Sequence, residues 1–217
     1  MTKTGGAARP LISADPDSLL DTFQAYRKQI TTTAIVVAVV VGGAFIWKAN
    51  TARRETQAEK AFFDAMALVS QRDAKAPDAL AKVAQRYSGT PGGIQAALLY
   101  AQAKFDDGKY ADGQKILDEV RSAGAFASGV EALKAAGYES EQKYDLAAQH
   151  YGKAVDKAEL QGEKDFLKGE QARALAAAGK RTDAAKLWAE LADKPDSPMA
   201  SEAKIRLGEL SATTAKP

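Results

Sequence analysis

The sequence predicts an all-α protein, in which one apolar N-terminal helix is followed by a stack of helical hairpins. Three observations predict this class. An uncharged run extends from residue 30 to residue 47. Small residues then recur at intervals of 34 positions through the rest of the chain. Alanine is abundant, while aromatic residues make up 7% of the 217 residues, and this composition favours closely packed helices over β-sheets.

The composition also excludes several classes of chemistry. The chain has no cysteine, a single histidine and a net charge of +2. A chain without thiols has no nucleophilic cysteine, no cysteine-based zinc site and no iron–sulfur cluster. A nearly balanced charge argues against a broad nucleic-acid surface, which needs a clustered excess of positive charge. We therefore expect no catalytic residues, no cofactor, no metal, no nucleic-acid partner and no small-molecule substrate.

Residues 1–28 are interpreted as a tail that ends in a short amphipathic segment. Glycine and proline interrupt the first 17 residues, which lack helical periodicity and predict a mobile stretch. From Ser18 onward, Leu19, Leu20, Phe23 and Tyr26 share one helical face. Two interpretations stay open for this segment. It lies on a membrane surface, or it is only the lead-in to the next helix.

Residues 29–48 are predicted to form a transmembrane helix. The 18 uncharged residues 30–47 would extend about 27 Å as a helix, near the thickness of a bilayer's hydrocarbon core. Tyr26 and Trp47 stand near its two ends, where such rings prefer the interface. A cleaved signal peptide is the alternative, but the run begins late and no A-x-A-like site follows it. The positive residues on both flanks leave the orientation open and weakly oppose a cytoplasmic N-terminus.

Residues 49–217 repeat. Two series of small residues and one series of large residues each have successive intervals of 34, 34 and 37 positions. The first small series is Ala67, Ala101, Ala135 and Ala172, the second is Ala79, Gly113, Ala147 and Ala184, and the large series is Val83, Leu117, Tyr151 and Trp188. An interval of 34 is typical of helix–turn–helix repeats.

Close packing explains why small residues recur. Each repeat would hold two antiparallel helices that cross where both residues are small: Ala101 against Gly113, Ala135 against Ala147, and Ala172 against Ala184. No single hairpin buries its apolar face, so stacking has to supply the core. Turns are predicted at residues 107–110, 142–144 and 179–181. The interval of 37 predicts a longer connection within residues 157–164.

The repeat pattern resembles the tetratricopeptide repeat family. The matching residues are Ala135, Tyr138, Tyr144, Ala147, Tyr151 and Ala154, together with the Gly108-Lys109-Tyr110 turn and Pro91. The resemblance implies an α-solenoid with clear units at about 94–127, 128–164 and 165–195. A degenerate unit at about 55–93 precedes them, and a capping helix at 198–211 follows.

The layout as a whole resembles the ancillary subunit of the bacterial Sec translocon. The segments that carry this likeness are GGAFIWKAN at the end of the anchor, RYSGTPGGIQAALLYA, and SPMASEAKIRLGEL near the C-terminus. The resemblance implies a single-pass protein of the inner membrane, with a cytoplasmic N-terminus and a periplasmic repeat domain. It also implies that the protein passes exported chains to periplasmic chaperones. The alternative is a structural or assembly subunit of another inner-membrane complex, respiratory or photosynthetic.

A protein-binding surface is predicted on the first helix of each unit, which lines the concave face. Its candidate residues are Leu68, Gln71, Gln95, Leu98, Gln102, Phe105, Glu139, Phe166 and Arg173. Leu98, Phe105 and Phe166 can hold an apolar segment. For Leu98 and Phe105 we prefer the alternative that they pack between neighbouring units. The lone His150 is interpreted as a surface or packing residue, and Gly92-Gly93 lacks the spacing of a phosphate loop.

Overall fold

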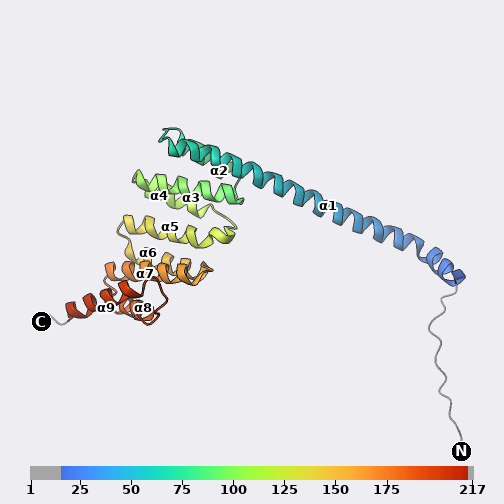
Figure 1. Cartoon of the computed structure of the whole chain (residues 1–217). Coiled ribbons are helices and arrows are strands. Elements are labelled where there is room, and N and C mark those ends of the chain that lie inside the picture. Colours follow the sequence, from blue (N-terminus) through green and yellow to red (C-terminus); the bar gives the residue numbers. More distant parts are fainter. Residues whose placement is uncertain (1–15, 215–217) are drawn as a thin grey trace, which may run out of the picture. The chain divides into compact units, whose positions relative to one another are not determined.

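The computed structural model describes the backbone of residues 16–214 and the side chains of residues 39–211. Within that part every regular element is a helix, which confirms the predicted all-α class (Figure 1). The helices are α1 (Pro16–Ser70), α2 (Ala76–Arg86), α3 (Pro91–Asp106), α4 (Tyr110–Asp118), a 3₁₀ helix (Gly124–Phe126), α5 (Ala127–Ser140), α6 (Tyr144–Lys157), α7 (Gln161–Ala177), α8 (Arg181–Ala192) and α9 (Ala200–Thr214). The chain divides into two compact units, residues 1–52 and 53–217.

The first unit contains the N-terminal part of α1. The predicted tail up to residue 15, and the side chains of the amphipathic segment and of residues 29–38, lie outside the described residues. Between residues 39 and 47 the large apolar side chains are exposed, by 61% for Val41 and by 73% for Phe45 and Trp47. Within the residues that the structure describes, no helix has an apolar stretch sufficient to span a membrane.

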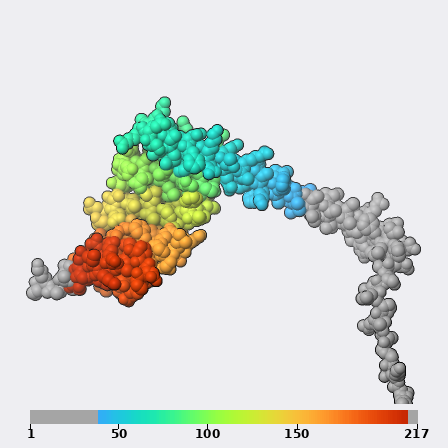
Figure 2. All heavy atoms as spheres, viewed as in Figure 1, coloured from blue at the N-terminus to red at the C-terminus, as the bar shows by residue number. Residues whose placement is uncertain are grey.

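The second unit is a stack of helical hairpins. Each helix from α2 onward packs against the next one in the chain, and the hairpins follow one another in chain order in Figures 1 and 2. The core consists of four local clusters instead of one central mass. Leu117, Trp188 and Leu191 are the largest fully buried side chains described. This arrangement is typical of repeat proteins, in which each hairpin is covered only by its neighbours.

Three hairpins turn through the same backbone motif. A residue with positive φ ends the first helix of each: Gly108 (φ 73°), Gln142 (φ 60°) and Gly179 (φ 79°). The N–H of the next residue, in each case a lysine, donates to the carbonyl five residues earlier at 2.7–2.9 Å. These bonds satisfy carbonyls left over at the helix C-terminus. The motif lies within the segments where turns are predicted.

The small residues lie where these three hairpins cross. Ala101, Ala135 and Ala172 have no exposed surface, and the same is true of Ala147 and Ala184. A Cβ on Gly113 would lie 3.0 Å from the carbonyl oxygen of Ala101 and 2.3 Å from Cε1 of Phe105, so this position has no room for a side chain. The large series is also buried, with exposed fractions between 1% for Leu117 and 7% for Val83.

The first hairpin departs from the predicted register. Ala67 is exposed and Ala79 is half-buried, whereas Ala65 is 2% exposed and belongs to the local core. The turn motif is the same here, with φ of 53° at Arg72 and Asp73 N–H donating to the carbonyl of Leu68 at 3.0 Å. Two additional residues, 74 and 75, then precede α2. They shift the equivalent of Ala101 from position 67 to position 65, which corrects the prediction for Ala67.

The interval of 37 has a different cause from the predicted one. The connection between α6 and α7 spans only residues 158–160, so it is not the longer loop that the spacing predicts. Helix α7 has 17 residues, whereas α5 has 14. The three additional residues therefore extend the start of α7 by nearly one turn, as expected for a helix with 3.6 residues per turn.

Candidate binding groove

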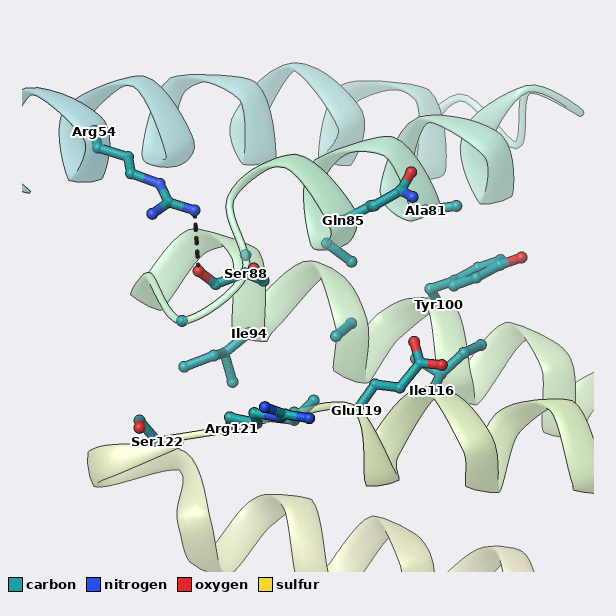
Figure 3. A pocket seen from close by; sticks show the side chains of 15 residues that line it. Arg54, Ala81, Gln85, Ser88, Ile94, Tyr100, Ile116, Glu119, Arg121 and Ser122 are labelled. Carbon is teal, nitrogen blue, oxygen red and sulfur yellow. Dashed lines mark hydrogen bonds between the residues drawn. The ribbon is translucent and has the colours of Figure 1, made fainter.

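A groove of about 860 Å³ lies between α2, α3 and α4, and we refer to it as the α2–α4 groove (Figure 3). It lies entirely within the second unit. The residues that line it are Arg54, Ala81, Ala84, Gln85, Ser88, Gly89, Gly93, Ile94, Ala97, Tyr100, Ile116, Glu119, Val120, Arg121 and Ser122. Six of these side chains are aliphatic, and we refer to them as its floor: Ala81, Ala84, Ile94, Ala97, Ile116 and Val120. Polar side chains make up much of the remaining lining. Such a combination is typical of binding sites.

The short length of α4 accounts for the groove. Helix α4 has 9 residues, whereas its counterpart α6 in the next hairpin has 14. After Asp118 the chain runs through an irregular connection, residues 119–123, which the 3₁₀ helix Gly124–Phe126 follows, and Ser122 in this connection has a φ of 53°. This connection holds Val120, Arg121 and Ser122 along one wall. A longer α4 would continue as helix where that wall now lies.

The opposite wall is fixed by the start of α3. The Thr90 hydroxyl donates to the carbonyl of Tyr87 at 2.7 Å and accepts from the N–H of Gly93 at 3.2 Å, which makes Thr90 an N-cap. A Cβ on Gly93 would lie 2.0 Å from the carbonyl oxygen of Tyr87, and one on Gly92 would lie 2.8 Å from the carbonyl of Ala58. The two glycines therefore allow α1 and the end of α2 to pack onto α3.

The charged side chains of the groove are two arginines and one glutamate. Arg54 extends from α1, and its Nη2 donates to the carbonyl oxygens of Arg86 and Ser88 at 3.3 Å each. Both acceptors are neutral, so these bonds hold the guanidinium in place without cancelling its charge. Arg121 and Glu119 are exposed on the α4 side. In Figure 3, Arg54 and Ser122 lie toward one end of the groove, and Tyr100 and Ile116 toward the other.

The predicted concave-face residues lie elsewhere, and none of the nine lines this groove. Phe105 is 6% exposed, and a Cβ on Gly137 of the next unit would lie 2.5 Å from its Cζ. Phe105 therefore packs between units, as in the alternative preferred from the sequence, and its place among the binding-face candidates is corrected. Leu98 is half-buried against the same core cluster. Phe166, at 48% exposed, is the one apolar candidate that stands largely in solvent.

Two charged candidates are engaged in contacts within the stack. Arg173 donates to both carboxylate oxygens of Glu202, from Nε at 3.1 Å and from Nη2 at 2.6 Å, and its Nη1 donates to Glu170. The bonds to Glu202 join α7 to α9, and the Glu202 partner raises the pKa of Arg173 above its ordinary value. Glu139 accepts a hydrogen bond from the Tyr151 hydroxyl at 3.1 Å. Burial, followed by the charge of Glu139, raises the pKa of Tyr151.

The remaining candidates are polar or half-buried. Leu68 and Gln95 are half-buried, while Gln71 and Gln102 are exposed. The amide of Gln102 donates to Asp106 at 2.8 Å on the same helix. Leu68 lies on α1, Gln71 lies in the turn after it, and Gln95 and Gln102 lie on α3. The α2–α4 groove escaped the sequence reasoning because the period of 34 does not depend on where α4 ends. The clearest sequence signal that α4 has ended is the Ser122-Ala123-Gly124 segment in the connection that follows it.

His150 belongs to a half-buried ionic cluster. Its Nδ1 lies 2.8 Å from Oε2 of Glu131, while Nζ of Lys157 donates to Oε1 at 2.6 Å. Glu131 is 8% exposed, and the Tyr138 ring lies 5.2 Å from the imidazole. The cluster joins α5 to α6, which is the role of a packing residue. Among the described side chains, no group of three or more His, Asp or Glu is placed to hold a metal ion.

The fold and the sequence place the chain among known proteins. Two solved structures, of nearly identical TPR-like repeats from a Podosopora anserina protein described as a kinesin light chain, have TM-scores of 0.59 and 0.58. Each is 16% identical over 74% of this chain, and the matches cover 88% and 87% of those chains. At that identity the likeness concerns the fold alone. No curated protein matches the sequence. Residues 21–212 match the model of the tetratricopeptide repeat-like domain, and the chain therefore belongs to that family.

Proposed function

We propose that this protein is a membrane-anchored adaptor that binds other polypeptides beside the Sec translocon during protein export. The observation that carries the proposal is the α2–α4 groove, with its aliphatic floor and polar surround, on a stack of hairpins. Tetratricopeptide repeat-like domains mediate protein–protein interactions. An adaptor needs such a surface and a means of staying near its partners.

Two observations support an anchor in α1. Residues 30–47 carry no charge. In the described part of that run, Val39, Phe45 and Trp47 are each more than 60% exposed. A contiguous apolar surface of this kind is unfavourable in water and favourable in a bilayer. Tryptophan at the end of the run suits the membrane interface.

The link to export rests on the sequence likeness of the anchor end, GGAFIWKAN, and of the RYSGTPGGIQAALLYA segment. It favours a cytoplasmic N-terminus and a periplasmic repeat unit in the inner membrane. The partners would then be the translocon, periplasmic chaperones and newly exported chains. Topology is tested with reporters fused after Pro217. We expect a reporter that works only in the periplasm to be active and a cytoplasmic reporter to be silent, and the opposite result contradicts the export role.

Affinity purification tests the partners. The full chain, tagged after Pro217, is cross-linked in cells, extracted in mild detergent and analysed by mass spectrometry. We expect translocon components together with many exported polypeptides, each below one copy per chain. A single stoichiometric complex, such as a respiratory or photosynthetic assembly without the translocon, would overturn the proposal. A matched control carries an unrelated single-pass anchor in place of residues 29–48, and it measures how much of the recovery depends on this anchor.

A further inference from the structure

We propose that the α2–α4 groove takes a short acidic and apolar polypeptide segment, whose aliphatic side chain lies on the floor while its Asp or Glu carboxylates pair with Arg54 and Arg121. This inference rests on the proposed adaptor function and names the class of polypeptide that the groove would bind. It depends on three features of the groove: its aliphatic lining, its charge and the way in which Arg54 is held.

The floor of the groove suits a branched aliphatic side chain. Ala81, Ala84 and Ala97 contribute only methyl groups to the lining, and Ile94 and Ile116 add branched aliphatic side chains. A volume of about 860 Å³ lies within the range of pockets that enclose small ligands. It suits a segment of a few residues and is too small for a folded domain. An aliphatic side chain that leaves water for this floor supplies the non-directional part of the affinity.

The charges of the groove favour an acidic segment over a basic one. Arg54 and Arg121 outnumber Glu119, the one acidic residue in the lining. Arg54 donates to two main-chain carbonyls, both through Nη2. A guanidinium has five N–H donors, so donors on Nε and Nη1 remain for a carboxylate. Pairs between arginine and a carboxylate are directional and often bidentate.

The carbonyls of Arg86 and Ser88 also reduce the entropic cost of binding. A long exposed arginine ordinarily loses rotamer freedom when it pairs with a ligand. Arg54 is already held at 3.3 Å from both oxygens, so less freedom remains to be lost. Arg121 lies on the other side of the groove, so a segment between them can satisfy both arginines.

The experiment uses the full chain in nanodiscs of zwitterionic lipid and a fluorescent eight-residue peptide of alternating leucine and glutamate. Two control peptides replace either glutamate by lysine or leucine by serine. Fluorescence anisotropy at low and high salt gives the affinities. We expect the leucine–glutamate peptide to bind about tenfold more tightly than either control, and its affinity to fall as salt rises.

Substitutions locate the binding. Arg121→Glu is expected to weaken the leucine–glutamate peptide about tenfold, and Glu119→Gln to strengthen it about twofold. The matched control is Arg181→Glu, which makes the same charge change at an exposed position of α8 outside the groove and is expected to leave the affinity unchanged. Arg121 is exposed, so its substitution leaves the fold intact, and circular dichroism verifies this.

Three outcomes would overturn the inference. The first is equal binding of the glutamate and lysine peptides, and the second is an equal loss of affinity for Arg121→Glu and Arg181→Glu. The third is that Arg121→Glu abolishes binding to phosphatidylglycerol vesicles and leaves the peptide affinity unchanged, which would assign the arginines to lipid headgroups. The adaptor function has a separate criterion: if the wild-type chain recovers its partners while the peptides show no preference, only this inference fails.

Discussion

Gly93 sets the closest approach between the end of α2 and the start of α3. A Cβ at this position would lie 2.0 Å from the carbonyl oxygen and 2.6 Å from the carbonyl carbon of Tyr87. Both atoms belong to the backbone, so no side chain can rotate away. The same carbonyl accepts the Thr90 hydroxyl that caps α3. An alanine at position 93 would therefore disturb the packing and the cap together.

We predict that Gly93→Ala lowers the free energy of unfolding by about 1–3 kcal/mol, because overpacking at a backbone contact forces the helices apart. Gly208→Ala is the control, since a Cβ there meets no atom within 4 Å. That change raises helix propensity and is expected to stabilise the chain by up to about 1 kcal/mol. Urea unfolding followed by circular dichroism measures both. Equal midpoints for the two variants would show that the contact at position 93 is looser than described.

Glu131 makes the stability depend on pH. Burial raises the pKa of its carboxyl, but hydrogen bonds from Lys157 and His150 outweigh burial and hold the pKa below its ordinary value of 4.5. A folded pKa below the unfolded one contributes stability that is present above the unfolded pKa and is lost as pH falls through the folded pKa. The contribution of Glu131 is therefore complete at neutral pH and disappears in acid below about 4.5.

We predict that Glu131→Gln costs about 1–3 kcal/mol at pH 7, because Lys157 then loses its charged partner. The variant should also lose less stability than the wild type between pH 5 and pH 3, since the group that titrates is gone. Urea unfolding at a series of pH values measures both effects. Glu159→Gln, at an exposed position, serves as the control. If the stability of Glu131→Gln falls with acid as steeply as that of the wild type, the pH dependence belongs to other carboxyls, such as Asp165. Burial raises the pKa of Asp165, but hydrogen bonds from Lys194 and Gln161 outweigh burial and hold that pKa below its ordinary value.

At the scale of the helix, the register of α1 determines which of two alanines, Ala65 or Ala67, faces α2. Ala65 is 2% exposed and shares a core cluster with Leu80 and Val83, whereas Ala67 is exposed. Positions two apart on a helix point about 200° apart, so only one of them can face α2. The structure assigns that place to Ala65, in contrast to the interval of 34.

We predict that Ala65→Leu destabilises the chain by about 1–3 kcal/mol through overpacking. Ala67→Leu should change stability by no more than about 0.5 kcal/mol, as for most surface substitutions. The two variants introduce the same side chain into the same helix, so helix propensity cancels between them. Thermal unfolding followed by circular dichroism is a sufficient measurement. If Ala67→Leu proves the more harmful of the two, α1 faces α2 with the register that the sequence predicts.

Sequence periodicity could predict the small residues at the crossings of the three regular hairpins. Ala101, Ala135 and Ala172 could be found from the sequence because each lies seven residues before the same kind of turn, so their distance from the turn is the same in all three hairpins. Ala67 was misplaced because residues 74 and 75 lengthen one loop without a change in the composition of the helices. A period averages over repeats, so it cannot assign two additional residues to one loop.

The candidate site was harder to predict because it depends on the end of a helix. The α2–α4 groove exists because α4 stops at Asp118 and the irregular residues 119–123 follow, of which 119–122 line the groove. Helix ends are poorly specified by propensity, and nothing in the 34-residue pattern distinguishes α4 from the longer α6. Phe105 is a residue that the sequence suggests for a binding face and that the structure places in the core. Its size and its place in the first helix suggest a binding face, but the glycines at 113 and 137 receive its ring.

At the scale of the whole second unit, stability is distributed along the stack. Each hairpin has its own cluster, and the last cluster combines Trp188 and Leu191 of α8 with Met199 and Ala203 near α9. Helix α9 has no helix after it in the described part of the chain, and Ser201, Lys204 and Arg206 are exposed on it. A polar outer face is what a terminal capping helix requires. Loss of α9 should therefore expose the apolar face of α8 first. The helices at the start of the stack should be destabilised last.

We predict that Ala203→Asp, which places a carboxylate at a position with no exposed surface, detaches α9 at a cost of about 2–4 kcal/mol. Hydrogen exchange measured by mass spectrometry should then show faster exchange in α8 and α9 and little change in α2 and α3, because the units are coupled only through their neighbours. Ile205→Asp introduces the same charge on the same helix at a residue that is 63% exposed, and it should leave exchange in α8 unchanged. Uniformly faster exchange from α2 to α9 in Ala203→Asp would mean that the second unit unfolds as one cooperative block, contrary to the local clusters that its side chains form.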